Sequence, residues 1–356
     1  MKPFYKILIA VNTVILIFVG ISFLVINNLR ENFALNHAAR TWGGGVTNYS
    51  QVSVYFGLLE GLNENAAYSK RQEIQKKLIA ESTIPKESEF PQWIDCAACS
   101  RTCDVYLESK KVECIVTGTW GDYFVFHPEQ LLYGCYYDSG SDNIDQIVLD
   151  DNATWQLFGG INTVGMTVMI EGRNYRISGI VKSPSGKIAE KAYGNTPRVY
   201  MPFESLTAID EYMTLSSYEM CMPEKVKGYA ASIAQGIFKE QFDRGDVVDQ
   251  THRFELVTLV ANSSDIKYAA MRLSTFSYPW RENCARAAEL ICQILALPSA
   301  ILLIITAVSL VVLMFVTAKL IGRFARFILK KMDDHREKRL RKAYAKKRAA
   351  MGNKGL

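Results

Sequence analysis

Residues 146–181 read QIVLDDNATWQLFGGINTVGMTVMIEGRNYRISGIV, a stretch that opens with a strand followed at once by a short helix. The IVL run predicts a strand, since β-branched and apolar residues fit a pleated, half-buried surface. Asp150 or Asp151 then caps a helix over 152–157, because an aspartate side chain accepts a hydrogen bond from a first-turn N–H group. Gly159 ends this helix, because glycine readily adopts the left-handed conformation found at helix ends.

The second half of the same stretch predicts a β-hairpin. Met166–Ile170 and Tyr175–Val181 are strand-like runs, and Glu171-Gly172-Arg173 between them is a turn signal. Further strand-like and helical runs lie on both sides of this stretch, so the sequence predicts a mixed α+β domain. Additional strands are predicted over 114–117, 123–126, 199–201, 218–222 and 254–260.

Two longer helices are also predicted on either side of the hairpin. Residues 67–81 place Ala67, Ile74 and Leu78 on one face, which is the pattern of a helix with one buried side. Pro223 opens a second helix that continues to Phe242, with an apolar stripe at Val226, Tyr229, Ile233 and Ile237.

The chain lacks the motifs of known catalytic centres. Gly160–Thr167 is the segment most similar to a phosphate-binding loop, but Met166 stands where such a loop needs a lysine to reach the phosphates. The four histidines form no H-E-x-x-H motif, and there is no G-x-S-x-G elbow. The sequence therefore predicts no enzyme, no catalytic, cofactor-binding or metal-ligating residue, and no cofactor.

Two uncharged apolar runs lie near the ends of the 356-residue chain. Ile7–Leu29 has 23 residues and Leu290–Ala318 has 29, and neither contains a charged side chain. Since about 20 helical residues cross a bilayer core, each run is long enough to span a membrane. The first run is too long for a cleaved signal peptide and is predicted to stay as an anchor. Pro298 predicts a kink or break in the second.

The charges are distributed so that both ends are basic and the middle is acidic. From Lys319 onward there are 14 basic and 3 acidic residues, whereas Arg30–Glu289 carries 25 basic and 33 acidic residues. Because basic flanks stay in the cytoplasm, both termini are predicted to be cytoplasmic in a cell-membrane protein. The predicted parts are a stub with the first membrane helix (1–29), an extracytoplasmic domain (30–289), the second membrane helix (290–320) and a basic cytoplasmic tail (321–356).

Two segments beside the membrane carry further expectations. Residues 30–40 are predicted to continue the first helix outward until Gly43-Gly44-Gly45, which forms a hinge. The tail begins with Arg323, Arg326, Lys330 and Lys331, which serve as a topology anchor or bind anionic lipid or a partner. Nucleic acid is not an expected partner for a segment tethered directly under a membrane.

The cysteines form an unusual cluster, because Cys96-Ala-Ala-Cys99-Ser-Arg-Thr-Cys103 puts three of them in eight residues. Outside the cytoplasm, disulfides are the expected outcome, with zinc binding and free thiols as alternatives. The candidates are Cys96, Cys99, Cys103, Cys114 and Cys135, and their pairing stays open.

Four sequence blocks resemble one permease family. They are VTGTWGDYF (116–124) with LYG (132–134), QIVLDDNATWQLFG (146–159), VGMTVMIEGRNYRISGIV (164–181) and PRVYMPF (197–203). Their order is similar to that of the extracytoplasmic core domain of MacB-type ABC-transporter permeases, the group that includes FtsX-like and lipoprotein-releasing permeases. The best match covers 113–206. Within it, Phe158, Gly159, Gly165, Gly172 and Gly179 are expected to set the fold rather than to bind a ligand.

The resemblance implies a function that is mechanical rather than catalytic. In this family the outer domain lies between the first and second membrane helices, and a cytoplasmic ATPase drives its motion through them. The resemblance therefore implies a permease-like subunit with a separate ABC ATPase. Family permeases have four spans and this sequence has two, so a second permease subunit is expected, with a homo-oligomer as a further arrangement. The alternative is a two-span sensor or scaffold whose outer domain binds a ligand or protein.

Overall fold

The computed structural model describes residues 3–42, 48–57, 60–137, 144–241, 246–264 and 278–352. It divides into two compact units, one made of residues 1–23 and 298–356, and the other of residues 24–297. Each unit is described by itself. The predicted Gly43-Gly44-Gly45 hinge lies outside the described residues.

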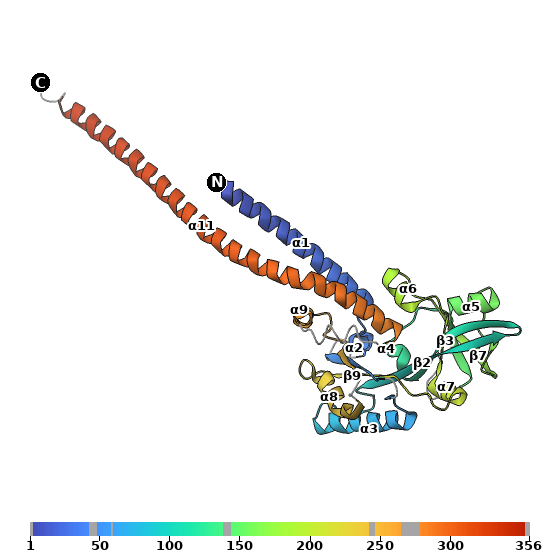
Figure 1. The fold of residues 1–356 in the computed structure, drawn as a ribbon. Helices are drawn as coiled ribbons and strands as arrows, with labels where there is room; N and C mark the ends of the chain where they lie inside the picture. The colour runs from blue at the N-terminus through green and yellow to red at the C-terminus, as the bar shows by residue number, and fades with distance from the viewer. Residues whose placement is uncertain are drawn as a thin grey trace. The chain divides into compact units, whose positions relative to one another are not determined.

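The two apolar runs form helices at the two ends of the chain, α1 (Pro3–Phe33) and α11 (Trp280–Gly352) (Figure 1). Both are long and apolar enough to cross a membrane. Helix α11 is unbroken at Pro298, so the break allowed for at this position does not occur. Its neighbouring turns continue the helix around the missing N–H group, as membrane helices often allow.

In the unit made of residues 1–23 and 298–356, a polar contact joins α1 to α11. The hydroxyl of Ser309 donates a hydrogen bond of 2.6 Å to Oδ1 of Asn12, whose side chain is buried. Such interhelical bonds favour association of helices in a lipid environment, where alternative polar partners are scarce.

The second unit is built on a mixed sheet whose described strands have the order β10-β1-β9-β2-β3-β8-β5-β7-β4. Strand β6 pairs with both β2 and β7, so β2, β3, β8, β5, β7 and β6 form a closed ring from which β9, β1 and β10 extend. The pairs β3–β8 and β5–β7 are parallel. The strands are β1 (Tyr49–Tyr55), β2 (Ile94–Leu107), β3 (Lys110–Gly121), β4 (Leu131–Gly134), β5 (Gln146–Asp150), β6 (Thr167–Ile170), β7 (Arg173–Val181), β8 (Arg198–Pro202), β9 (Ser217–Pro223) and β10 (Asp246–Asp249).

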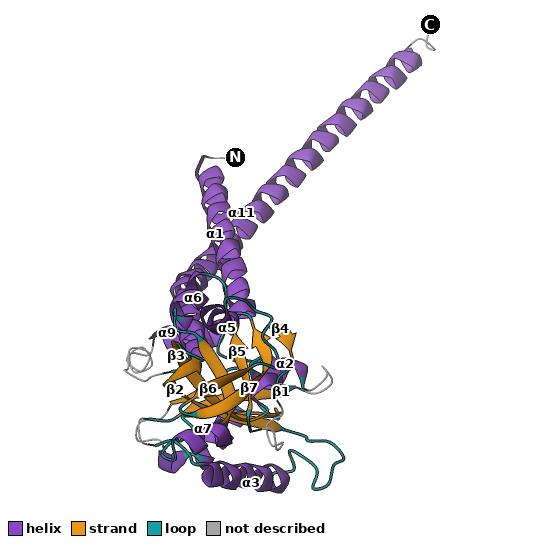
Figure 2. Cartoon of the chain, turned by 90° about the vertical axis from the view of Figure 1, so that its right-hand side faces the viewer, coloured by secondary structure: helices purple, strands orange, loops and turns teal. Residues whose placement is uncertain are grey.

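Shorter helices cover this sheet, and in both views α3 lies on the side of the strands opposite α6 (Figures 1 and 2). They are α2 (His37–Thr41), α3 (Glu64–Ala80), α4 (Tyr123–Phe126), α5 (Asp151–Phe158), α6 (Lys187–Tyr193), α7 (Phe203–Ile209), α8 (Tyr229–Ile237), the 3₁₀ turn Lys239–Gln241 and α9 (Leu256–Ser264). Helix α3 buries the predicted face of Ala67, Ile74 and Leu78 in the main core, which also contains Ile233 and Ile237 of α8.

Residues 146–181 fold as their sequence pattern predicts. Asp150 is the N-cap of α5, and its Oδ1 accepts a 2.7 Å hydrogen bond from the amide of Ala153. Gly159 ends the helix in the left-handed conformation with φ 71°. Strands β6 and β7 form the predicted hairpin, and its turn residues Glu171 and Gly172 both have positive φ. The α+β prediction is therefore confirmed where local signals determine the structure.

Two segments predicted as strands are helical instead. Residues 123–126 form α4, which closes on the carbonyl of Asp122 and turns Tyr123 and Phe126 into a core cluster. Residues 256–264 form α9, and Leu259 packs in an apolar cluster with residues of α1 and α11. In both segments apolar side chains are buried by tertiary contacts that a short run of sequence does not reveal.

Three further boundaries differ from the predictions. Helix α1 ends at Phe33, and 37–41 form the separate helix α2. The helix predicted from Pro223 begins only at Tyr229, after Gly228 in the left-handed conformation, so Val226 lies exposed outside it. The cysteine-rich segment, for which no element was predicted, lies within the 14-residue strand β2.

Candidate functional site

The first turns of α11 carry acidic side chains that are buried against the end of the sheet. Arg253, in the turn after β10, donates from Nη1 to Oε2 of Glu282 at 2.9 Å and from Nε to Oε2 of Glu289 at 2.7 Å. The exposed fractions of these residues are 3%, 0% and 0%. Glu282 and Glu289 are seven residues apart and therefore share one face of the helix. One guanidinium thus fixes two turns of α11 to the sheet.

A second arginine on α11 extends the same contact to strand β10. Arg286 donates from Nη2 to Oδ2 of Asp246 at 2.5 Å and from Nε to Oε1 of Glu282 at 2.7 Å. Its guanidinium carbon lies 3.7 Å from the ring centroid of Tyr278. Burial disfavours the charged form of Arg286, but Glu282 and Asp246 outweigh this effect and raise its pKa, so the ion pairs stay charged.

We call this group the sheet–helix junction, made of Tyr55, Asp246, Gln250, Arg253, Glu282, Arg286 and Glu289. Tyr55 of β1 belongs to it because its hydroxyl donates to Oε2 of Glu282 at 3.1 Å. Burial, and then the charge of Glu282, raise the pKa of Tyr55 well above its usual value, so the phenol remains a donor.

A chain of hydrogen bonds leads from the junction into the sheet. Gln250 Nε2 donates to Glu282 Oε2 and to Ser53 Oγ, both at 3.1 Å. Ser53 Oγ in turn donates to Glu219 Oε2 at 2.7 Å, and Glu219 Oε1 lies 2.5 Å from Nε2 of His127. All five residues are buried. The chain therefore runs from α11 through β1 to β9 without reaching solvent.

The base of α1 reaches the same strands through α2. The amide of Ala38 donates to Oε1 of Gln51 at 3.2 Å, and Nε2 of Gln51 donates to Glu219 at 3.4 Å. His37 Nδ1 lies 3.1 Å from the carbonyl oxygen of Val125, after β3. Helix α2, which follows α1, is therefore connected by buried polar contacts to β1 and through Gln51 to β9, and α11 is connected to β1.

An apolar cluster completes the attachment of the two helix bases. Ile26 of α1 packs with Phe254 and with Leu259 of α9. Helix α11 contributes a row of small residues at four-residue spacing, namely Ala288, Cys292 and Ala296. Small side chains at this spacing allow neighbouring segments to approach closely.

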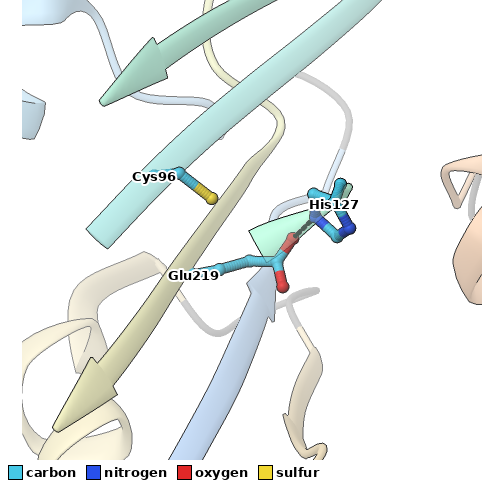
Figure 3. A group of neighbouring side chains, drawn as sticks. All are labelled: Cys96, His127 and Glu219. Atoms are coloured by element: carbon cyan, nitrogen blue, oxygen red, sulfur yellow. Dashed lines mark hydrogen bonds and ion pairs between the residues drawn. The ribbon is translucent and has the colours of Figure 1, made fainter. Parts of the chain in front are cut away.

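The chain of hydrogen bonds ends in the sheet at Glu219, which lies beside a cysteine and a histidine (Figure 3). Cys96 of β2, His127 after α4 and Glu219 of β9 each offer one polar atom, and these atoms lie within 4.8 Å of one another. Burial, together with Glu219 and Asp95, raises the pKa of Cys96 well above its usual value.

The predicted fold-setting residues lie in the β5–β7 part of the sheet, away from the junction. Phe158 is half-buried at the end of α5, where it packs against the main core. Gly159, Gly165 and Gly172 all have positive φ. Gly179 of β7 lies close to the backbone that follows β4, because an added Cβ would lie 2.4 Å from the carbonyl oxygen of Cys135.

All eight cysteines are free thiols in the structure, so the predicted disulfides are absent. Alternation along β2 explains this for the clustered three, since Cys96 lies in one core cluster and Cys99 and Cys103 lie in the other. Cys103 lies opposite Cys114 in the ladder of β2 and β3, where both are free thiols. Cys135 is exposed after β4. Burial raises the pKa of Cys99 and of Cys114 to about 12. The Cys96-x2-Cys99 pair also cannot close on one metal ion.

The basic residues Arg323, Arg326, Lys330 and Lys331 are exposed on α11, in the unit formed by 1–23 and 298–356. The junction residues were missed by sequence reasoning. Glu282, Arg286 and Glu289 share a helical face just before the apolar run, which is a signal for a partner on that face. Nothing in the sequence indicates that the partner is Arg253.

Comparison with known proteins gives one family and a set of distant structures. Residues 9–244, about two thirds of the chain, match the MacB-like periplasmic core domain. No curated protein matches the chain in sequence. The periplasmic region of MacB from Actinobacillus actinomycetemcomitans is similar at 15% identity and a TM-score of 0.40, over 58% of this chain and 92% of that one.

The extracellular domain of the noncanonic ABC-type transporter YknZ from Gram-positive bacteria is similar at 11% identity and a TM-score of 0.39. This match covers 56% of the present chain and all of the other. The family resemblance of residues 113–206 is thus confirmed, and the family match extends over residues 9–244.

Proposed function

Because the chain belongs to the family of MacB-like periplasmic core domains, we propose that it is a membrane-anchored ABC-transporter permease-type subunit that transmits motion to its outer domain. Residues 30–289 form the outer domain, the first membrane helix lies within residues 1–29 and the second is formed by residues 290–320, and both termini are cytoplasmic. The basic flanks of the two apolar runs support this orientation.

The observation that carries the proposal is the buried contact of Arg253 with Glu282 and Glu289. A subunit that transmits movement needs a connection that does not yield between the membrane helix and the domain. Breaking a buried ion pair leaves an uncompensated charge in the protein interior, which costs about 3–5 kcal/mol. The contact of Arg253 with the two glutamates therefore resists separation. A displacement of the base of α11 is thereby passed to β10, and through Gln250 to β1.

The source of the motion in this proposal is a separate ABC ATPase in the cytoplasm. Arg323, Arg326, Lys330 and Lys331 supply an exposed basic surface on α11 that suits an acidic face of such an ATPase or anionic lipid headgroups. A second permease subunit, or a second copy of this chain, also belongs to the proposal. No catalytic residue is assigned.

Gentle detergent purification of the tagged full-length protein, followed by mass spectrometry, tests the assembly. We expect an ABC ATPase and a second permease subunit in stoichiometric amounts. A homo-oligomer recovered without any ATPase would overturn the proposal and favour a two-span sensor or scaffold.

Coupling itself is tested in the purified complex by comparing Glu289→Gln with Glu31→Gln. Glu289 is buried in the junction, whereas Glu31 forms an exposed pair with Arg40. We expect Glu289→Gln to uncouple ATP turnover from movement of the outer domain, measured by a fluorescent probe on α3, and Glu31→Gln to leave both unchanged. Equal movement in both variants would contradict a role of the junction in transmission.

A further inference from the structure

The cluster at the inner end of the hydrogen-bond chain combines three different donor groups in one buried place. Cys96, His127 and Glu219 come from three separate segments and have exposed fractions of 1%, 5% and 4%. Their side chains converge on one another from β2, the loop after α4 and β9 (Figure 3). Such convergence of polar groups in a core is uncommon, because each buried polar group must find a partner.

We propose that Cys96, His127 and Glu219 form a binding site for a transition-metal ion of the zinc type. Thiolate, imidazole and carboxylate are the three ligand types that Zn²⁺ takes in proteins, whereas Ca²⁺ and Mg²⁺ require oxygen ligands. The thiol loses its proton when its sulfur binds the ion. A cysteine thiolate and a glutamate carboxylate together balance the double positive charge, so the buried site becomes neutral.

The hydrogen bonding of the cluster supports this assignment. Oε2 of Glu219 accepts hydrogen bonds from Ser53 and Gln51. Oε1, which lies toward His127, is therefore the carboxylate atom that would bind the ion. Partners of this kind orient carboxylate ligands in metal sites. The other ring nitrogen of His127, Nδ1, is buried and has no hydrogen-bond partner among the described residues. Among the described residues, the ring of His127 is thus held by one hydrogen bond alone, to Glu219.

The change required of the His127–Glu219 pair is small. His127 Nε2 and Glu219 Oε1 are 2.5 Å apart, while nitrogen and oxygen ligands of a tetrahedral ion with bonds of about 2.0–2.1 Å lie roughly 3.3 Å apart. The ion therefore replaces this hydrogen bond after a separation of less than about 1 Å. A cavity lined by His127, Glu219, Tyr123 and Arg281 adjoins the cluster and gives room for a fourth, water ligand.

Cobalt binding by the full-length protein tests the site. The protein is purified in detergent with its affinity tag removed, treated with a chelator, and titrated with Co²⁺ and then Zn²⁺. We expect one equivalent of Co²⁺ with a thiolate-to-cobalt charge-transfer band and the visible bands of tetrahedral cobalt. One equivalent of Zn²⁺, counted by elemental analysis, should displace it and raise the melting temperature.

Matched variants decide whether the ligands are the ones proposed. Cys96→Ser should remove the charge-transfer band and weaken binding at least tenfold, and His127→Gln should weaken binding similarly. Cys99→Ser lies on the same strand but on the opposite face, so it should bind as the wild type does. His252→Gln removes another histidine that lies between carboxylates, and it too should leave binding unchanged.

Should Cys96→Ser fail to fold, Glu219→Gln provides a second test, because glutamine keeps the shape of the side chain and still accepts from Ser53. It should fold and lose most of the cobalt affinity. The proposal is wrong if the wild type binds no cobalt, if its spectrum lacks the thiolate band, or if the band persists in Cys96→Ser.

Discussion

Two regions of the molecule are stabilised by different chemistry. One is the part of the sheet formed by residues 146–181, called here the hairpin half, and the other is the sheet–helix junction. Around β5–β7 the structure depends on local features, namely a capped helix, a tight turn and glycines with positive φ. At the junction it depends on ion pairs between residues far apart in the chain, such as Arg253 and Glu282. A substitution in the first region disturbs local backbone geometry, whereas one in the second leaves buried charges behind when one partner is removed.

The largest effect is expected from Arg253→Met, which removes the cation from two fully buried carboxylates. The free energy of unfolding should fall by about 3–5 kcal/mol, because Glu282 and Glu289 are buried and both lose the Arg253 guanidinium, while Glu282 retains Arg286. Urea unfolding of the full-length protein in detergent measures this, with tryptophan fluorescence as the probe.

The matched control for this change is Arg40→Met. Arg40 pairs with Glu31 at 2.7 Å, but the side chains are 52% and 47% exposed. Exposed pairs stabilise by at most about 1 kcal/mol, so the control should unfold nearly as the wild type does. Similar losses in both variants would show that burial does not distinguish the junction.

The second prediction concerns Asp150, the buried carboxyl that caps α5. Burial raises its pKa to about 6, although the hydroxyl of Tyr193 and the amide of Ala153 stabilise the charged form. Since the folded-state pKa is above the unfolded value of 3.8, this group favours folding below about pH 4 and loses that contribution as the pH rises to 6.

Asp150→Asn should remove this dependence, because asparagine caps helices as aspartate does but does not ionise. Between pH 4 and 7 the stability of the variant relative to the wild type should rise by about 3 kcal/mol, from a shift of roughly two pKa units. Urea unfolding at both pH values checks it. A constant difference between the two proteins would contradict the assignment.

The third prediction addresses the close approach of backbone at Gly179. An added Cβ would lie 2.4 Å from the carbonyl oxygen of Cys135, so Gly179→Ala must push the backbone around β4 and β7 apart. Overpacking of this kind destabilises by about 1–3 kcal/mol. The glycine at Gly20 of α1 has open space around it, and Gly20→Ala should not lower the melting temperature. Equal melting temperatures for both variants would contradict the steric reading.

The same contrast explains how far the sequence could predict the molecule. The cap at Asp150, the turn at Gly172 and the apolar face of α3 depend on neighbouring residues, so short patterns were sufficient. Helix α4 was predicted as a strand because its aromatic residues satisfy a strand pattern equally well, and tertiary packing decided between the two.

The candidate site lay beyond such reasoning. The junction joins residues 246–253 to residues 282–289. The cluster of Cys96, His127 and Glu219 joins β2, the loop after α4 and β9. Cys96, Cys99 and Cys103 were expected to form disulfides, with their pairing left open. In the strand that they share, however, Cys96 and Cys99 point to opposite faces.

The smallest effect, and the sharpest local comparison, concerns the two adjacent glycines after α5. Gly159 has φ 71°, whereas Gly160 does not have a positive φ, and an added Cβ meets nothing within 4 Å at either position. Gly159→Val should therefore cost about 1–2 kcal/mol through backbone strain alone, and Gly160→Val should cost clearly less. Thermal melting of the two full-length variants under identical conditions measures the difference. If Gly159→Val melts with the wild type, the left-handed helix end is not what stabilises this half of the sheet.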